Sequence, residues 1–188
     1  HYRLQDDINV NLPHEIAKKE NLLTALQHDS ATFAANHAQS VGDTFRAEIS
    51  GHTFTSKEDA GQALIDRIHT EAEKIMSGAD DALAWSDSIQ IGSYCGFDVR
   101  LTRDALKNMA LWVQGKTKRE VEIGNTPQGM MQRLGNALAS FEPNISSCEQ
   151  SIMRLKEQLA SAKEEVDKPW PQEDEYQLKA ARLNELNF

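Results

Sequence analysis

The sequence is poor in cysteine, in aromatic residues and in long apolar runs. Its 188 residues include two cysteines, Cys95 in an expected strand and Cys148 at an expected helical core position. Thiols in such different contexts suggest neither a disulfide framework nor a zinc quartet, so we expect a reducing, cytoplasmic environment. No apolar run approaches the roughly 20 residues that cross a bilayer, and no membrane partner is expected.

Acidic residues are in excess over basic ones. There are 29 Asp and Glu against 20 Lys and Arg, which gives a formal net charge of −9. Repulsion from phosphates then argues against nucleic-acid or anionic-membrane binding by the whole surface, although a local basic face stays compatible. The composition is that of a helix-rich globular chain with one core. Since the chain opens at His1 without methionine, we interpret residues 1–188 as a single module of a longer polypeptide.

Two long helices are expected near the ends of the chain. Pro13 suits the first turn of a helix over 13–39, and a heptad repeat predicts a coiled-coil helix over 145–168. The two have similar lengths, and we expect them to pair as an antiparallel stalk. Either helix could instead pair with a second copy of the chain, but Ser30 and His37 at seam positions favour a monomer. The heptad positions are Ile145, Cys148, Ile152, Leu155, Leu159, Ala162 and Val166.

Between these helices, alternating apolar residues predict an antiparallel sheet within a head over 43–141. Three strand pairs are expected, each closed by a turn that contains glycine. A capping-box pattern precedes a helix over 57–77, and Thr126 with Pro127 opens another helix, which Pro143 should separate from the heptad helix. The strand pairs are 45–49 with 52–54, 89–91 with 97–101, and 111–113 with 120–123.

The predicted fold class is therefore α+β, with a long antiparallel helical hairpin as a coiled-coil stalk and a small head of antiparallel sheet plus helices. The prolines around Trp170 should break the heptad helix, and a short closing helix is expected over 172–187.

The sequence shows no catalytic signature. Gly115-Lys116-Thr117 is similar to the end of a phosphate-binding loop, but Ala110 occupies the position of the loop's first glycine and no long helix follows. Cys95 could act as a nucleophile only beside a histidine, and the six histidines form no metal-ligand pairs. We expect no enzyme activity in this chain, no metal and no cofactor.

One stretch of the acidic chain is basic. Between Phe97 and Glu120, six Lys and Arg residues outnumber three Asp and Glu, whereas residues 163–175 are strongly acidic. Basic side chains beside an aromatic one could contact a nucleic-acid backbone and stack on bases. A merely solvated strand face is an equally good interpretation. The candidate nucleic-acid-binding residues are Arg100, Arg103, Lys107, Trp112, Lys116, Lys118 and Arg119.

Four stretches carry a resemblance to a known family. They are KEDAGQAL at 57–64, IGSYCGF at 91–97, GMMQRLGNAL at 129–138, and AKEEVDKPW at 162–170 continuing to LNELN at 183–187. Together they resemble the C-terminal domain of very large phage and mobile-element proteins, which combine an SNF2-like superfamily 2 helicase with, often, an N6-adenine DNA methyltransferase, some of them in anti-restriction.

The resemblance implies a non-catalytic accessory module that contacts DNA or other domains of its parent polypeptide, the parent being an ATP-dependent helicase or DNA methyltransferase. None of the family's helicase or methylase motifs falls in this chain, so no catalytic residue is carried over. The alternative is a protein-interaction or oligomerisation module that acts through the coiled coil and the acidic tail. An autonomous enzyme ranks last.

Overall fold

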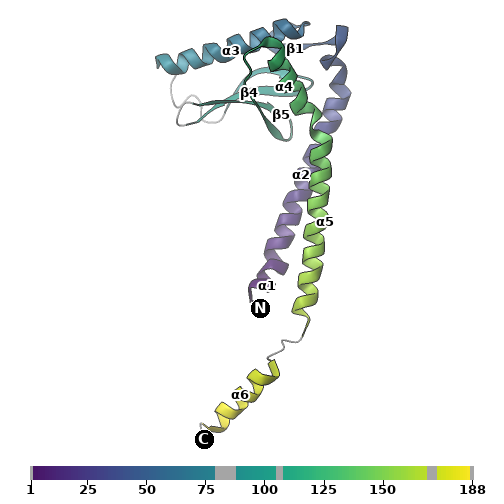
Figure 1. The fold of residues 1–188 in the computed structure, drawn as a ribbon, viewed down its shortest axis with the longest axis vertical. Coiled ribbons are helices and arrows are strands. Elements are labelled where there is room, and N and C mark those ends of the chain that lie inside the picture. Colours follow the sequence, from purple (N-terminus) through teal and green to yellow (C-terminus); the bar gives the residue numbers. More distant parts are fainter. Residues whose placement is uncertain (1, 79–87, 105–107, 169–172, 187–188) are drawn as a thin grey trace. The chain divides into compact units, whose positions relative to one another are not determined.

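The computed structural model describes residues 2–78, 88–104, 108–168 and 173–186 (Figure 1). These residues form two compact units. We call residues 1–20 with 149–188 the helical unit and residues 21–148 the sheet unit. In chain order the elements are α1 (Tyr2–Asp6), a π-helical turn η1 (Asp7–Asn11), α2 (Leu12–Asn36), two 3-10 turns η2 (His37–Ser40) and η3 (Gly42–Thr44), β1 (Ala47–Ile49), β2 (His52–Phe54), α3 (Lys57–Ser77), β3 (Ile89–Tyr94), β4 (Phe97–Arg103), β5 (Met109–Gln114), β6 (Lys118–Val121), α4 (Pro127–Ala139), α5 (Phe141–Val166) and α6 (Glu173–Leu186).

The expected mixture of helix and antiparallel sheet is confirmed. The three predicted strand pairs form and join into one six-stranded antiparallel sheet, in the order β2-β1-β3-β4-β5-β6. The pairing of β1 with β3 joins strands that are far apart in the sequence, because α3 lies between them. The tight turn from β3 to β4 is Cys95-Gly96, and both residues have positive φ angles, 51° and 85°. Positive φ angles at both central residues are what a type I′ hairpin turn requires.

Strand alternation gives the sheet a buried and an outer face. Side chains such as those of Val99, Leu101 and Leu111 are fully buried, while their neighbours along each strand are partly exposed. Helices α3 and α4 cover the buried face (Figure 1), and they contribute Leu64 and Leu134 to the same core. The outer face therefore lies on the side of the sheet away from α3 and α4.

The two covering helices approach each other closely at Gly61. A Cβ atom at this position would overlap the carbonyl oxygen of Pro127, at the start of α4. Only glycine therefore allows α3 to reach the first turn of α4. That first turn is capped as predicted, since the Gly129 amide donates to Thr126 Oγ1 at 3.2 Å.

The boundary between α4 and α5 differs from the prediction. We expected Pro143 to separate the two helices, but α4 ends at Ala139 and α5 begins at Phe141. Pro143 therefore lies in the first turn of α5, where the missing amide hydrogen breaks no helical hydrogen bond. The break falls at Ser140, whose hydroxyl donates to the Ala137 carbonyl at 2.8 Å.

The heptad helix forms, and its seven predicted seam positions are buried or half-buried while nearly all other positions of α5 after Phe141 are exposed. Within the helical unit, the first part of α2 and the second part of α5 lie side by side (Figure 1). Lys156 Nζ is 2.7 Å from Glu20 Oε1, and Ile16 and Ile152 are buried. Pairing of α2 and α5 along their whole length as a coiled-coil stalk remains a prediction.

Candidate functional site

The candidate nucleic-acid residues divide between the two faces of the sheet. Arg100 of β4 and Trp112 of β5 are paired across the strands, and both lie on the outer face. Lys118 of β6 follows on the same face, diagonal to Trp112. The outer face also carries polar and acidic neighbours from β3 to β6, namely Gln90, Ser93, Asp98, Thr102, Gln114 and Glu120.

Hydrogen bonds hold both outer-face residues in place. Arg100 Nε donates to Ser88 Oγ at 2.7 Å, and its Nη1 lies 3.7 Å from Asp98 Oδ2. The indole Nε1 of Trp112 donates to Thr102 Oγ1 at 2.8 Å. Both side chains are half-buried, so a ligand would meet a cation and an aromatic ring that are already ordered.

Lys116 and Lys118 are exposed at the turn between β5 and β6, and a buried carboxylate fixes this turn. Asp29 of α2 is 1% exposed. It accepts hydrogen bonds from the Lys116 amide at 2.8 Å and from the amide and hydroxyl of Thr117, each at 2.7 Å. Asp29 was not among the predicted site residues, although an acidic side chain inside an apolar helical stripe is a signal for a buried, hydrogen-bonded carboxylate.

Arg119 belongs to the buried face. Its Nη1 donates to Ser140 Oγ at 2.8 Å, and its guanidinium carbon lies 4.4 Å from the centre of the Phe141 ring. Burial lowers the pKa of Arg119, and the nearby charge of Asp29 opposes that shift. Arg103, at the end of β4, shares the alternation of Leu101 on the buried face. Lys107 lies outside the described residues.

The charge of the outer face is mixed. The sheet unit contains 16 acidic and 11 basic residues, so its charge as a whole repels phosphates. On the face itself, Asp98 is close to Arg100, and Glu120 is paired with Trp112 in the sheet register. Contact with nucleic acid would therefore depend on a few ordered side chains and on the two exposed lysines of the turn.

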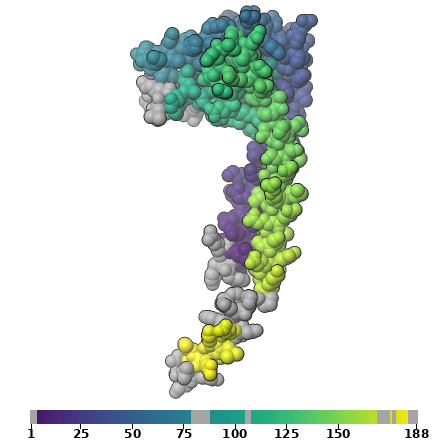
Figure 2. All heavy atoms as spheres, in the orientation of Figure 1, coloured from purple at the N-terminus to yellow at the C-terminus, as the bar shows by residue number. Residues whose placement is uncertain are grey.

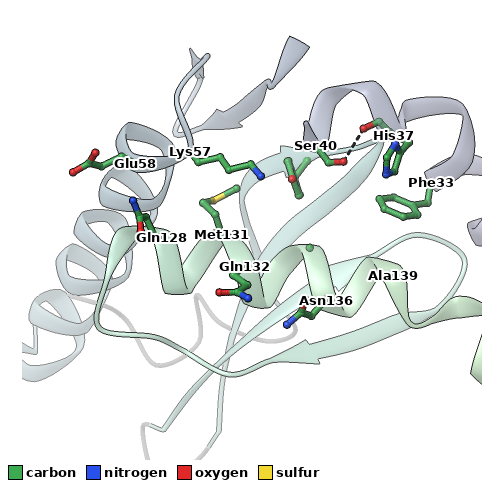
Figure 3. A pocket seen from close by; sticks show the side chains of 12 residues that line it. Phe33, His37, Ser40, Lys57, Glu58, Gln128, Met131, Gln132, Asn136 and Ala139 are labelled. Atoms are coloured by element: carbon green, nitrogen blue, oxygen red, sulfur yellow. Dashed lines mark hydrogen bonds between the residues drawn. The ribbon is translucent and has the colours of Figure 1, made fainter. Parts of the chain in front are cut away.

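A second feature of the sheet unit is a hollow of about 520 Å³ on the helix-covered side of the sheet. Two of its lining residues, Tyr94 and Met131, are buried. Figure 3 shows Lys57 and Gln128 toward one end of the hollow and the rings of Phe33 and His37 toward the other. These two rings are in edge-to-face contact, with centres 5.5 Å apart.

Side chains of α4 form one wall of the hollow, and α4 reaches the surface of the sheet unit (Figure 2). The amides of Gln128, Gln132 and Asn136 recur every four residues along this helix. Within the described parts of the chain, these amides and the Lys57 ammonium have neither a hydrogen-bond nor an ion-pair partner. Sequence reasoning missed the hollow, because its walls come from segments about 100 residues apart.

The two cysteines of the chain are free and buried. Burial raises the pKa of the Cys95 thiol to about 11, although a hydrogen bond with Tyr94 acts in the opposite direction. Burial also raises the pKa of Tyr94. In the folded chain, Cys95 therefore stays protonated until the pH approaches about 11.

We expect Cys95 to be almost unreactive toward a disulfide reagent at pH 8. A shift from the ordinary thiol pKa of about 8.5 to about 11 lowers the reactive thiolate by roughly 100-fold or more, and burial blocks access as well. The measurement is the labelling rate of a Cys148→Ser variant with and without guanidinium. Equal rates in the two conditions would contradict the burial of Cys95.

Within the ranges that the structure describes, no three His, Cys, Asp or Glu side chains are grouped so that they could hold a metal ion. The helices of the described residues include none that is both long and apolar enough to cross a membrane. Comparisons with protein-family models, with curated proteins and with solved structures give no match to this chain.

Proposed function

We propose that this chain is a non-catalytic accessory module of a large DNA-acting protein of the helicase or methyltransferase type, the phage and mobile-element family that its sequence resembles. In this proposal it contacts nucleic acid through the outer face of the sheet. The observation that carries the proposal is the cross-strand pair of Arg100 and Trp112, ordered on a polar face.

The chemistry of this face suits single-stranded nucleic acid. An indole on a flat sheet can stack on a base only when that base is not already stacked in a duplex. Lys116 and Lys118 at the adjacent turn could contact the backbone phosphates, and Arg100 could do so or stack on a base. Because the sheet unit is acidic as a whole, binding should be local and strongly weakened by salt.

Fluorescence anisotropy with a labelled single-stranded oligonucleotide and the matching duplex tests this proposal. Trp112→Ala is expected to weaken single-strand binding at least fivefold, since one stacked base contributes about 1–3 kcal/mol. Lys118→Glu should weaken binding and make it less sensitive to salt. Lys163→Glu is the matched control, because it makes the same change of charge on an exposed residue of the helical unit.

Binding that is absent at low salt, or that falls equally in the Lys163→Glu control, would contradict the proposal. Charge reversal of Arg119 is not a suitable test, because its guanidinium is packed against Phe141 and hydrogen bonded to Ser140. Loss of binding in that variant would report damage to the core.

One observation favours a second candidate function, that of a protein-interaction module. Helix α6 exposes Leu178 and Leu183, which are 69% and 64% accessible. Large apolar side chains on an acidic helix are suited to docking a partner helix.

The oligomeric state depends on how α2 and α5 pair, and light scattering measures it. Pairing of α2 with α5 inside one chain predicts a monomer of 21.0 kDa, and pairing between chains predicts a dimer.

A further inference from the structure

A glycine in the middle of α4 has no explanation in the packing of the chain itself. Gly135 lines the hollow, and a Cβ atom added there would have no neighbour within 4 Å. Glycine inside a helix is less stable than alanine, so its presence here costs stability without allowing any contact within the described chain. The benefit of glycine at such a position is that another backbone can approach closely.

The amides on either side of Gly135 have the spacing of an extended peptide. Four residues of helix rise about 6 Å along the axis, and two residues of a β-strand advance about 6.6–6.8 Å. A strand that runs along α4 can therefore place alternate residues against Gln128, Gln132 and Asn136, one residue to each amide. A side-chain amide has both a donor and an acceptor, which matches the donor and acceptor of a peptide group.

The two ends of the hollow differ in chemistry. Lys57 lies near Gln128 and is the one Lys or Arg among the described residues of the lining, whereas the carboxylate of Glu58 extends away in Figure 3. At the other end, Phe33 and Ala139 offer apolar surface. From Gln128 to Asn136 the wall is about 12 Å long, the span of about four strand residues.

We propose that this hollow binds an extended peptide segment of a partner protein. The segment carries an Asp or Glu side chain, which pairs with Lys57, and an apolar side chain about four residues away, which packs against Phe33. Its backbone runs along α4 past Gly135 and hydrogen bonds to the amides of Gln132 and Asn136. This inference does not depend on nucleic-acid contact at the outer face.

The first experiment is a selection of phage-displayed random 12-residue peptides on the immobilised full chain. The expected consensus has one acidic and one apolar position, separated by about four residues. A consensus peptide with a fluorescent label is then titrated by anisotropy. A selection without a consensus, or a consensus without an acidic position, overturns the proposal.

Variants of the hollow provide the decisive comparison. Gly135→Leu fills the space above α4 and is expected to weaken the consensus peptide at least tenfold. Lys57→Glu should weaken it similarly, and a peptide whose acidic residue is changed to lysine should recover binding to that variant. Gln27→Ala in the sheet unit and Lys163→Glu in the helical unit change exposed residues outside the hollow, and both variants should bind the peptide as the unchanged chain does.

Gly135→Ala is the control for correct folding. It should raise the Tm by about 2–4 °C, because alanine is the better helix former. If Gly135→Leu keeps the circular dichroism of the unchanged chain and still binds the peptide with the original affinity, the hollow is not the site. Binding of the peptide in a helical conformation, shown by nuclear Overhauser effects, would also overturn the proposal.

Discussion

Changing Gly61 to alanine is expected to destabilise the sheet unit by about 2–3 kcal/mol. The added methyl group would overlap the backbone of Pro127, and backbone atoms cannot move aside as a flexible side chain can. Helices α3 and α4 would have to separate, although both supply fully buried core residues such as Leu64 and Leu134. The measurement is the free energy of unfolding in urea, followed by circular dichroism.

Gly135→Ala is the matched control for this prediction. It makes the same chemical change in the interior of a helix of the same unit, but the new methyl group meets open space. We expect it to stabilise the chain by about 0.5–1 kcal/mol, the ordinary gain of alanine over glycine in a helix. Opposite signs for the two variants would show that the effect at Gly61 comes from the contact of the helices. Equal signs would refute the close approach of α3 to α4.

The second large effect is expected for Asp29→Ala, at about 3 kcal/mol, or a fall in Tm of about 6–12 °C. The carboxylate accepts three hydrogen bonds from Lys116 and Thr117. Hydrogen bonds to a charged group contribute about 1.5–3 kcal/mol each, but water can replace part of them at this half-exposed turn. Amide hydrogen exchange should accelerate most at Lys116 and Thr117.

Two further variants separate the hydrogen bonds from other effects at this position. Asp29→Asn keeps one acceptor oxygen and should lose about half of the stability that the alanine variant loses. His28→Ala changes the exposed neighbour, whose Nδ1 lies 3.6 Å from the carboxylate, and should change stability by less than about 0.5 kcal/mol. A destabilisation by His28→Ala as large as that by Asp29→Ala would refute the assigned role of the carboxylate.

Local chemistry made much of the fold predictable. The heptad spacing of α5 foretold which of its residues are shielded, because a helix that buries one stripe repeats every three to four residues. Gly96 and the alternation beside it foretold the hairpin of β3 and β4. Thr126 before Pro127 gave the start of α4 correctly, since the cap and the first turn depend only on neighbours in the sequence.

Other features depend on contacts between distant residues, and the sequence alone did not reveal them. The pairing of β1 with β3 requires the chain to return past α3, and nothing local specifies that return. The same limit applies to Asp29, whose partners are almost 90 residues away. At Pro143 the prediction failed for another reason. A proline can follow the end of one helix or lie in the first turn of the next, and Pro143 does the second, two residues after Phe141, whose ring stacks on that of Phe97.

The candidate site was predictable only in part. Alternation along the strands correctly suggests that Arg100 and Trp112 share a face, once their pairing is known. It also places Arg119 on the buried face with Val121, two residues further on. A count of basic residues could not separate the outer-face positions from the buried ones. A basic residue in a strand is available to a ligand only when its side chain points outward.

The two-sided construction of the sheet unit bears on how this chain could work within a larger assembly. The outer face and the hollow lie on opposite sides of one sheet, so ligands at the two surfaces need not compete for space. Consider a nucleic acid and a peptide that belong to one assembly. Once either is bound to the chain, the other is held near its own site at an effective concentration that reaches the millimolar range when the link between them is short and flexible. Two weak contacts would then suffice for one durable association.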